Sequence, residues 1–302
     1  MALTAEDAAR VAAVTGGVLP EVVAVPAAVG SLRCLAFGRV DDPPVLLVHG
    51  NGGHALWWAP LVPALVPGWR AIALDLRGHG ASAHASPPAY RIEDFASDLD
   101  AVVAALGLGP LPVVGHSMGG RVALWWTARR PDAVRALGLL DTRFDPVDAE
   151  TAAQYRGRVA GRREGRRYPT RDAAVAAFRF VPDEPDVPAA VVAMLASYAV
   201  APCADGDGWT FRFDRAVLSI DGDGGGDLHR LLPAVRCPTW VAAGADSWVC
   251  TPAHRGRIAA ALPRCTTAAF PGAHHFLVAR GAAVGAALRG FLDGLPPAAP
   301  RR

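Results

Sequence analysis

Gly115-His116-Ser117-Met118-Gly119 is the stretch that decides the fold. It follows the short apolar run 111–114 and precedes residues 120–126, whose pattern is helical. A serine on a sharp turn between a strand and a helix is a nucleophile elbow, and that strained turn needs small residues two positions before and two after the serine. Gly115 and Gly119 meet this requirement. The sequence therefore predicts that Ser117 is a nucleophile.

Strand-like runs alternate with helical segments on both sides of this elbow. Helical character is found at residues 92–106 and 120–129. Alternating strands and helices predict an α/β fold with a mostly parallel central sheet and helices on both faces. Chemistry in such folds lies at the carboxyl ends of the strands. The predicted strands cover residues 45–48, 71–74, 111–114, 136–140, 239–243 and 267–270.

Residues 142–234 break the alternation. They are inserted between two predicted strands and contain helical segments near 170–178 and 187–200. We therefore expect a core of residues 1–141 and 235–302 with a lid of residues 142–234. The arginine-rich part, 156–171, fits a solvated hinge, and the alternative is that it steers an anionic substrate. An Asp/Gly run at 221–227 lacks the glutamate that closes a calcium loop, so we interpret it as a flexible return from the lid.

The composition limits the possible partners and the compartment. The 302 residues are 52% apolar and 19% charged with a net charge of +2, which gives no indication of a nucleic-acid partner. The five cysteines are scattered without a C-x-x-C pair, so we expect reduced thiols, a cytoplasmic setting and no zinc site. Glu6 and Asp7 stand where a secretory signal would carry positive charge. The uncharged stretch 187–204 contains two prolines, which favours a buried helix over a membrane span. The composition leaves the oligomeric state open.

A serine hydroxyl needs a base to take its proton and a group to orient that base. His275 is the expected base, because it follows the last predicted strand and gives the chain order serine, acid, histidine. Its neighbour His274 is expected to form a wall of the site. His49 and His79 lie in glycine-flanked turns, where a structural hydrogen-bonded role is expected.

The oxyanion of an acyl-transfer reaction needs backbone N–H donors. One is expected from Met118, the residue after the nucleophile. The second is expected from Asn51 in the glycine-rich loop 49–53, which follows a predicted buried strand.

Four motifs together resemble the α/β-hydrolase superfamily. They are the His49-Gly50 loop, the Asp-x-Arg-Gly-x-Gly-x-Ser segment at 75–82, the elbow, and the terminal Pro-Gly-Ala-x-His at 271–275. The resemblance covers residues 45–134 and 238–295 and is specific for the fold, not for a substrate. It implies a lidded, esterase-like member that needs no cofactor.

The acid departs from the common pattern of that superfamily. Many members place it three residues after the glycine that ends the seventh strand, and here that position holds Ser247, with Asp246 one residue early. Other members place it at the end of the sixth strand, which corresponds to Asp141. A shift of one residue in an extended segment turns the side chain to the other face. This argument favours Asp141 and leaves Asp246 as the alternative.

Several aromatic side chains near these motifs are candidates for a substrate pocket. Most tryptophan rings pack in cores, but some of these follow the predicted strand ends closely. They favour a small hydrophobic or aromatic substrate. The candidates are His54, Trp57, Trp58, His116 and Trp248.

The sequence thus predicts a serine hydrolase without cofactor or metal, acting on a carboxylic ester, a thioester or a lactone. The same residues would also serve a hydrolase of C–C or amide bonds, a lyase or a cofactor-free oxygenase. A ligand-binding module with an idle triad is the alternative from another class. One scaffold hosts many reactions, so the fold does not choose among them.

Overall fold

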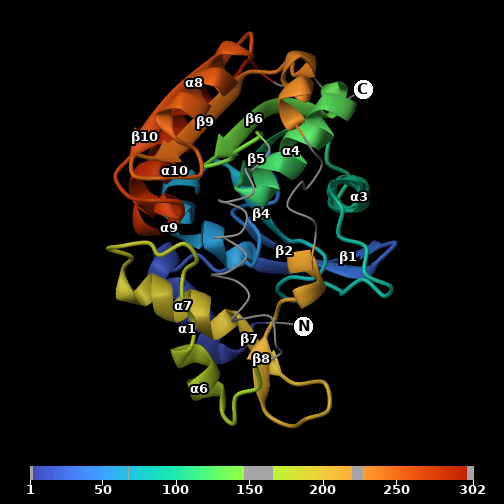
Figure 1. Ribbon diagram of the computed structural model, residues 1–302, viewed down its shortest axis with the longest axis vertical. Coiled ribbons are helices and arrows are strands. Elements are labelled where there is room, and N and C mark those ends of the chain that lie inside the picture. Colours follow the sequence, from blue (N-terminus) through green and yellow to red (C-terminus); the bar gives the residue numbers. More distant parts are fainter. Residues whose placement is uncertain (1–2, 67, 146–165, 220–226, 298–302) are drawn as a thin grey trace.

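An eight-stranded sheet forms the centre of the structure, a computed structural model that describes residues 3–66, 68–145, 166–219 and 227–297 (Figure 1). The strand order is β1-β2-β4-β3-β5-β6-β9-β10. β1 and β2 pair antiparallel, β2 pairs antiparallel with β4, and all other neighbours are parallel. The bounds are β1 Glu21–Ala27, β2 Gly30–Phe37, β3 Pro44–Val48, β4 Arg70–Asp75, β5 Leu111–His116, β6 Val134–Leu140, β9 Thr239–Gly244 and β10 Cys265–Phe270.

The predicted fold class is confirmed. All six predicted apolar runs are strands of this sheet, namely β3, β4, β5, β6, β9 and β10. The antiparallel hairpin of β1 and β2 was not predicted. It extends the sheet beyond β4, so that β4, β3 and β5, which precede three of the motifs, are interior strands, while β10 is the opposite edge.

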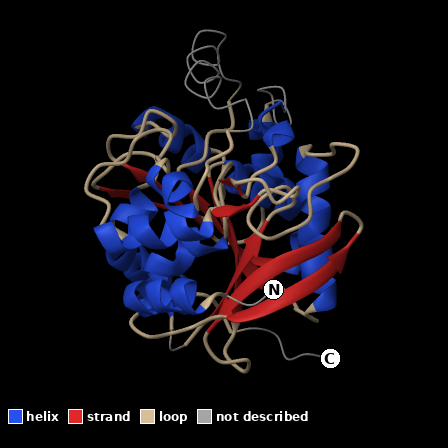
Figure 2. Cartoon of the chain, turned by 90° about the horizontal axis from the view of Figure 1, so that it is seen from below, coloured by secondary structure: helices blue, strands red, loops and turns tan. Residues whose placement is uncertain are grey.

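Helices cover both faces of the sheet, as Figure 2 shows. Successive residues of β3 point to opposite faces, because side chains alternate along a strand. Leu46 and Val48 belong to the apolar core under α3, α4 and α8, whereas Val45 and Leu47 belong to the core under α1, α2, α9 and α10. The bounds are α1 Ala5–Thr15, α2 Val62–Leu65, α3 Ile92–Ala105, α4 Met118–Arg129, α8 Pro252–Ala260, α9 Phe276–Ala279 and α10 Gly281–Asp293.

Part of the chain between β6 and β9 forms a group of elements beside α1 (Figure 1). It contains α6 (Arg171–Ala176), α7 (Ala189–Tyr198), and the small hairpin of β7 (Val200–Pro202) and β8 (Trp209–Phe211). Short 3₁₀ helices, η3 (Arg215–Ser219) and η4 (Leu228–Ala234), follow; η1 (Ala55–Leu61) and η2 (Pro131–Ala133) belong to the loops of the central sheet.

This inserted group contacts the loops at the carboxyl ends of β3 and β4. The Tyr198 hydroxyl donates to Asp75 at 2.8 Å, and the His54 ring donates to the Leu195 carbonyl at 3.2 Å. These contacts fit the expected lid, and the division into core and lid stays a prediction. Most of the arginine-rich part and of the Asp/Gly run lies outside the described residues. No helix in the described ranges combines the length and the apolar character that a bilayer crossing requires.

Candidate active site

Ser117 lies at the turn between β5 and α4 in a strained backbone conformation, with φ 55° and ψ −120°. The two glycines of the motif make this turn possible. A Cβ on Gly115 would lie 2.3 Å from the Gly119 carbonyl oxygen, and a Cβ on Gly119 would lie 2.2 Å from the Val48 carbonyl oxygen. Both distances are far below van der Waals contact, so larger residues would open the elbow.

His274 joins Ser117 to Asp141. The Ser117 hydroxyl lies 2.9 Å from His274 Nε2, and His274 Nδ1 lies 3.1 Å from Asp141 Oδ1. The pairing fits a neutral ring that accepts from the serine and donates to the carboxylate. The His274 and Asp141 side chains are both buried, so little water competes for these contacts.

The prediction that His275 contacts Ser117 is corrected, because His274 makes this contact. His275 is the residue before α9, and its ring turns toward Trp57 and Phe180, with centroids 4.9 and 5.7 Å away. Within the described residues its ring makes no hydrogen bond to Ser117 or Asp141. A shift of one residue in this tight turn sends the ring to a different side of the loop.

Asp141 is held by three donors besides His274. Its Oδ2 accepts from the Gly244 N–H at 2.9 Å, and its Oδ1 accepts from the Ser247 hydroxyl at 2.6 Å and the Cys250 N–H at 3.2 Å. The backbone of Asp141 has φ 44°, which directs the side chain off the end of β6. The structure therefore brings Asp141, and not the exposed Asp246, to the histidine.

Ser247 is a residue of this site whose part in it the sequence did not reveal. It occupies the position three after Gly244, where many superfamily members carry the acid. Here its hydroxyl donates to Asp141, the acid from the neighbouring strand end. The sequence signal that could have revealed Ser247 was its position, which in many superfamily members holds the acid.

The loop after β3 comes directly against the nucleophile. A Cβ on Gly50 would lie 3.0 Å from Ser117 Cβ, so the loop packs without space for a side chain there. Asn51 follows at once, and Met118 begins α4, where the first N–H groups of a helix have no partner within it. The arrangement is compatible with two donors for an oxyanion, and that role stays a prediction.

Residues 43–185 match the family described as the α/β hydrolase fold. An esterase of Mycobacterium tuberculosis is 36% identical over 171 residues, which are 56% of this chain and 55% of that protein. A human serine hydrolase-like protein is 38% identical over 114 residues, 37% of this chain and 56% of that one. The structure of a thermophilic esterase from Thermogutta terrifontis is 27% identical with a TM-score of 0.69, covering 90% of this chain and 98% of that one.

The chain has the α/β-hydrolase fold. The predicted resemblance to that superfamily is thereby confirmed. The matches cover between 36% and 56% of the length of the first curated relatives.

Two of the predicted pocket residues of this α/β hydrolase lie beside the serine. The Trp57 ring is stacked near His116 with centroids 6.3 Å apart, and the His116 ring lies 4.7 Å from that of His274. His116 donates from Nε2 to the His274 carbonyl at 2.9 Å, so it also holds the loop of the base. Burial lowers the pKa of His116 well below its ordinary range, which keeps this ring neutral at pH 7.

The other three predicted pocket residues of this α/β hydrolase lie in different surroundings. Trp58 is fully buried in the apolar core. His54 is bonded to the Leu195 carbonyl of α7, and burial lowers its pKa well below 6.5. Trp248 is 37% exposed on the loop after β9.

Three imidazoles of this α/β hydrolase are close enough to approach a single metal ion. The ligand atoms of His116, His274 and His275 lie within 4.8 Å of one another. Both nitrogens of His274 and Nε2 of His116 already have partners, so a metal would have to replace the contacts of Ser117 or Asp141. The donor set thus fits the serine–histidine pairing better than a resident metal.

His49 and His79 hold the loop after β3 in this α/β hydrolase. His49 donates from Nδ1 to the Gly50 carbonyl at 2.7 Å, and His79 Nε2 accepts from the Gly52 N–H at 3.1 Å. Both rings are fully buried, and burial lowers the pKa of His49 to about 4 and that of His79 to about 3. The two histidines therefore have the expected structural role as neutral rings.

We expect this α/β hydrolase to lose stability on mild acidification. Below pH 6.5 the histidines of the unfolded chain become protonated. In the folded chain the buried rings of His49 and His79 stay neutral until about pH 4 and about pH 3, respectively. Each such ring lowers the free energy of unfolding by up to about 1.4 kcal/mol per pH unit. Three carboxylates whose pKa burial raises act in the opposite direction: Asp75, Asp98 and Glu184. Six histidines of the described residues have a lowered pKa: His49, His54, His79, His116, His254 and His275.

The check is the Tm at pH 7 and at pH 5, measured at constant ionic strength. Since the histidines outnumber the opposing carboxylates, we expect the Tm to be lower at pH 5 by about 10 °C. An equal or higher Tm at pH 5 would show that the buried rings do not control the acid stability.

Proposed function

We propose that this chain is a serine hydrolase that cleaves a carboxylic ester, a thioester or a lactone through an acyl-enzyme on Ser117. One observation carries the proposal: the buried His274 ring lies 2.9 Å from the Ser117 hydroxyl and 3.1 Å from Asp141. The esterase from Mycobacterium tuberculosis and the esterase from Thermogutta terrifontis support the choice of an ester bond.

The first half of the reaction forms the acyl-enzyme. Ser117 Oγ attacks the substrate carbonyl carbon while His274 Nε2 takes the hydroxyl proton. Asp141 accepts from Nδ1–H and stabilises the imidazolium that forms. His274 then gives the proton to the leaving oxygen or sulfur as its bond to the carbonyl carbon breaks.

The second half releases the acid. His274 takes a proton from a water molecule, the hydroxide attacks the acyl carbon, and the proton returns to Ser117 Oγ as the ester bond to the serine breaks. In both halves the negative charge on the carbonyl oxygen would be held by the N–H groups of Met118 and Asn51. Each proton that His274 takes up is given back in the same half of the reaction, so the cycle needs only the substrate, water and the groups of this chain.

The rings around the serine favour a small hydrophobic or aromatic substrate. Trp57, Phe180 and His275 pack against one another beside His274. Burial keeps the pKa of His275 well below 6.5, so these rings together present a neutral surface at pH 7. Contact between these rings and an apolar acyl group removes apolar surface from water, which favours binding.

A series of p-nitrophenyl esters from acetate to octanoate, with benzoate and a lactone, tests this proposal. We expect turnover by the wild type and a loss of at least about a thousandfold in kcat/KM for Ser117→Ala, because the nucleophile is removed. Ser31→Ala, at an exposed position of β2, is the matched control and should retain wild-type rates. Turnover by Ser117→Ala within tenfold of the wild type would refute the nucleophile.

A further inference from the structure

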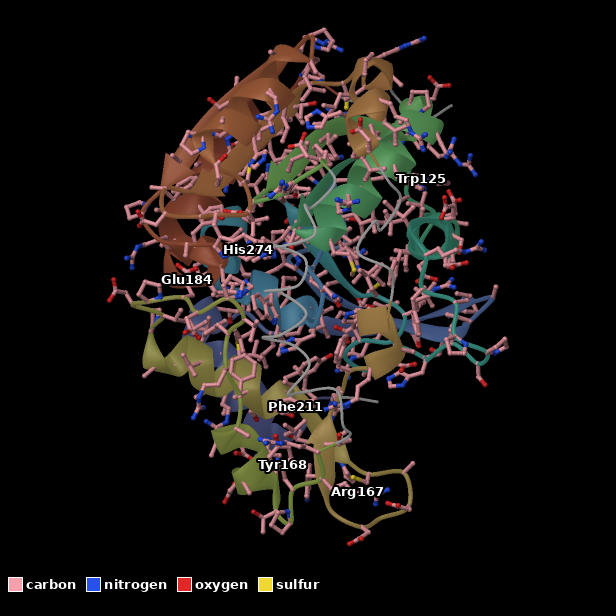
Figure 3. The ribbon with its side chains drawn as sticks, viewed as in Figure 1. Trp125, Arg167, Tyr168, Glu184, Phe211 and His274 are labelled. Carbon is pink, nitrogen blue, oxygen red and sulfur yellow. The ribbon has the colours of Figure 1, made fainter. Side chains whose placement is uncertain are left out.

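Glu184 comes from the chain between β6 and β9 and reaches the loop that carries His274. Its Oε1 accepts from the Ala273 N–H at 2.8 Å, and its Oε2 accepts from the His275 N–H at 2.7 Å. The two donors stand on either side of His274 in the sequence. One carboxylate thus holds the backbone before and after the histidine that contacts Ser117, as the positions of Glu184 and His274 in Figure 3 illustrate.

The contact is built into the fold of the loop. The Glu184 side chain is buried, with 8% of the residue exposed. Gly272 has φ 117°, and a Cβ at this position would lie 2.6 Å from Glu184 Oε1. Only a glycine allows the carboxylate to come this close to the two N–H groups. The loop and the carboxylate therefore fit each other.

His274 also acts on the carboxylate through its charge. Burial raises the pKa of Glu184, whereas its two N–H partners and the charge of His274 lower it. The titratable groups that face this carboxylate are His274 and His275 on the loop and Asp141 from the end of β6.

We infer that Glu184 is a positioning residue for His274 and that it couples the base to the chain inserted between β6 and β9. The inference rests on the proposed function, since it assigns a role to the base of that reaction. Because His274 must lie within hydrogen-bond reach of both Ser117 and Asp141, a small displacement of the loop would weaken both contacts at once.

The test compares Glu184→Gln and Glu184→Ala with Asp186→Asn. Asp186 belongs to the same segment and accepts from Arg280 at 3.2 Å, but it is exposed and contacts neither N–H group of the loop. Rates are divided by the amount of Ser117 that a fluorophosphonate labels when the reaction is carried to completion, which removes the effect of misfolded protein. The readouts are kcat and KM, measured separately.

We expect Glu184→Ala to lower kcat about tenfold to a hundredfold with KM within about twofold, because the base is displaced while the rings around the substrate remain. Glu184→Gln keeps the shape but retains only one of the two acceptor oxygens, so its kcat should fall less than that of Glu184→Ala. Asp186→Asn should match the wild type.

Wild-type kcat in both Glu184 variants would overturn the inference. So would a loss that disappears once rates are divided by labelled Ser117, since Glu184 would then only stabilise the fold. Failure of the wild type itself to hydrolyse esters and to be labelled would instead refute the proposed function.

Discussion

Replacing His274 with alanine is expected to reduce kcat/KM for ester hydrolysis about ten-thousandfold. The His274 ring contacts both Ser117 and Asp141, at 2.9 and 3.1 Å, so its loss removes the base and separates the acid from the serine. His275→Ala is the matched control in the adjacent position. It should retain activity within about tenfold, because its ring makes no hydrogen bond to either group in the described residues.

The measurement is the initial rate on the best p-nitrophenyl ester at pH 7.5. Both variants are compared with the wild type after their Tm values show that they are folded. The assignment of the base fails if His275→Ala is inactive and His274→Ala keeps most of its turnover.

Asp141→Asn is expected to lower kcat about a thousandfold to ten-thousandfold. The amide that replaces the carboxylate has one acceptor oxygen instead of two, so it cannot accept from His274 and from all three other donors. The His274 ring then loses its orientation, and the negative charge that stabilises its protonated form is gone. Asp246→Asn should stay within about twofold of the wild type, because that side chain is exposed.

The same ester assay checks this pair of variants. A reversed order, with Asp246→Asn inactive and Asp141→Asn active, would contradict the geometry at the end of β6. An intermediate loss in Ser247→Ala would support it, since the Ser247 hydroxyl donates to Asp141 at 2.6 Å.

The parallel strands and the elbow could be predicted because their signals are local. A buried parallel strand is a short apolar run, and the elbow is a fixed spacing of glycines around Ser117. The β1–β2 hairpin has no comparable signal, since Pro26 and several small residues interrupt its pattern. Its place in the sheet depends on antiparallel pairing with β4, about forty residues away.

The site was harder to predict because its last contacts are not local. Which of His274 and His275 faces Ser117 depends on the turn at 272–275, and Glu184 holds that turn from 89 and 91 residues away in the chain. No pattern near the two histidines carries this information. The choice of Asp141 could be favoured from the sequence, because its position at a strand end fixes its direction.

The central claim is that Ser117 forms a covalent intermediate with the help of His274. Peptide mapping by mass spectrometry after reaction with a fluorophosphonate tests it most directly. We predict one adduct, on Ser117, that forms quickly in the wild type and in His275→Ala and very slowly in His274→Ala. An adduct on another residue, or labelling of Ser117 at the same rate in all three proteins, would contradict the account.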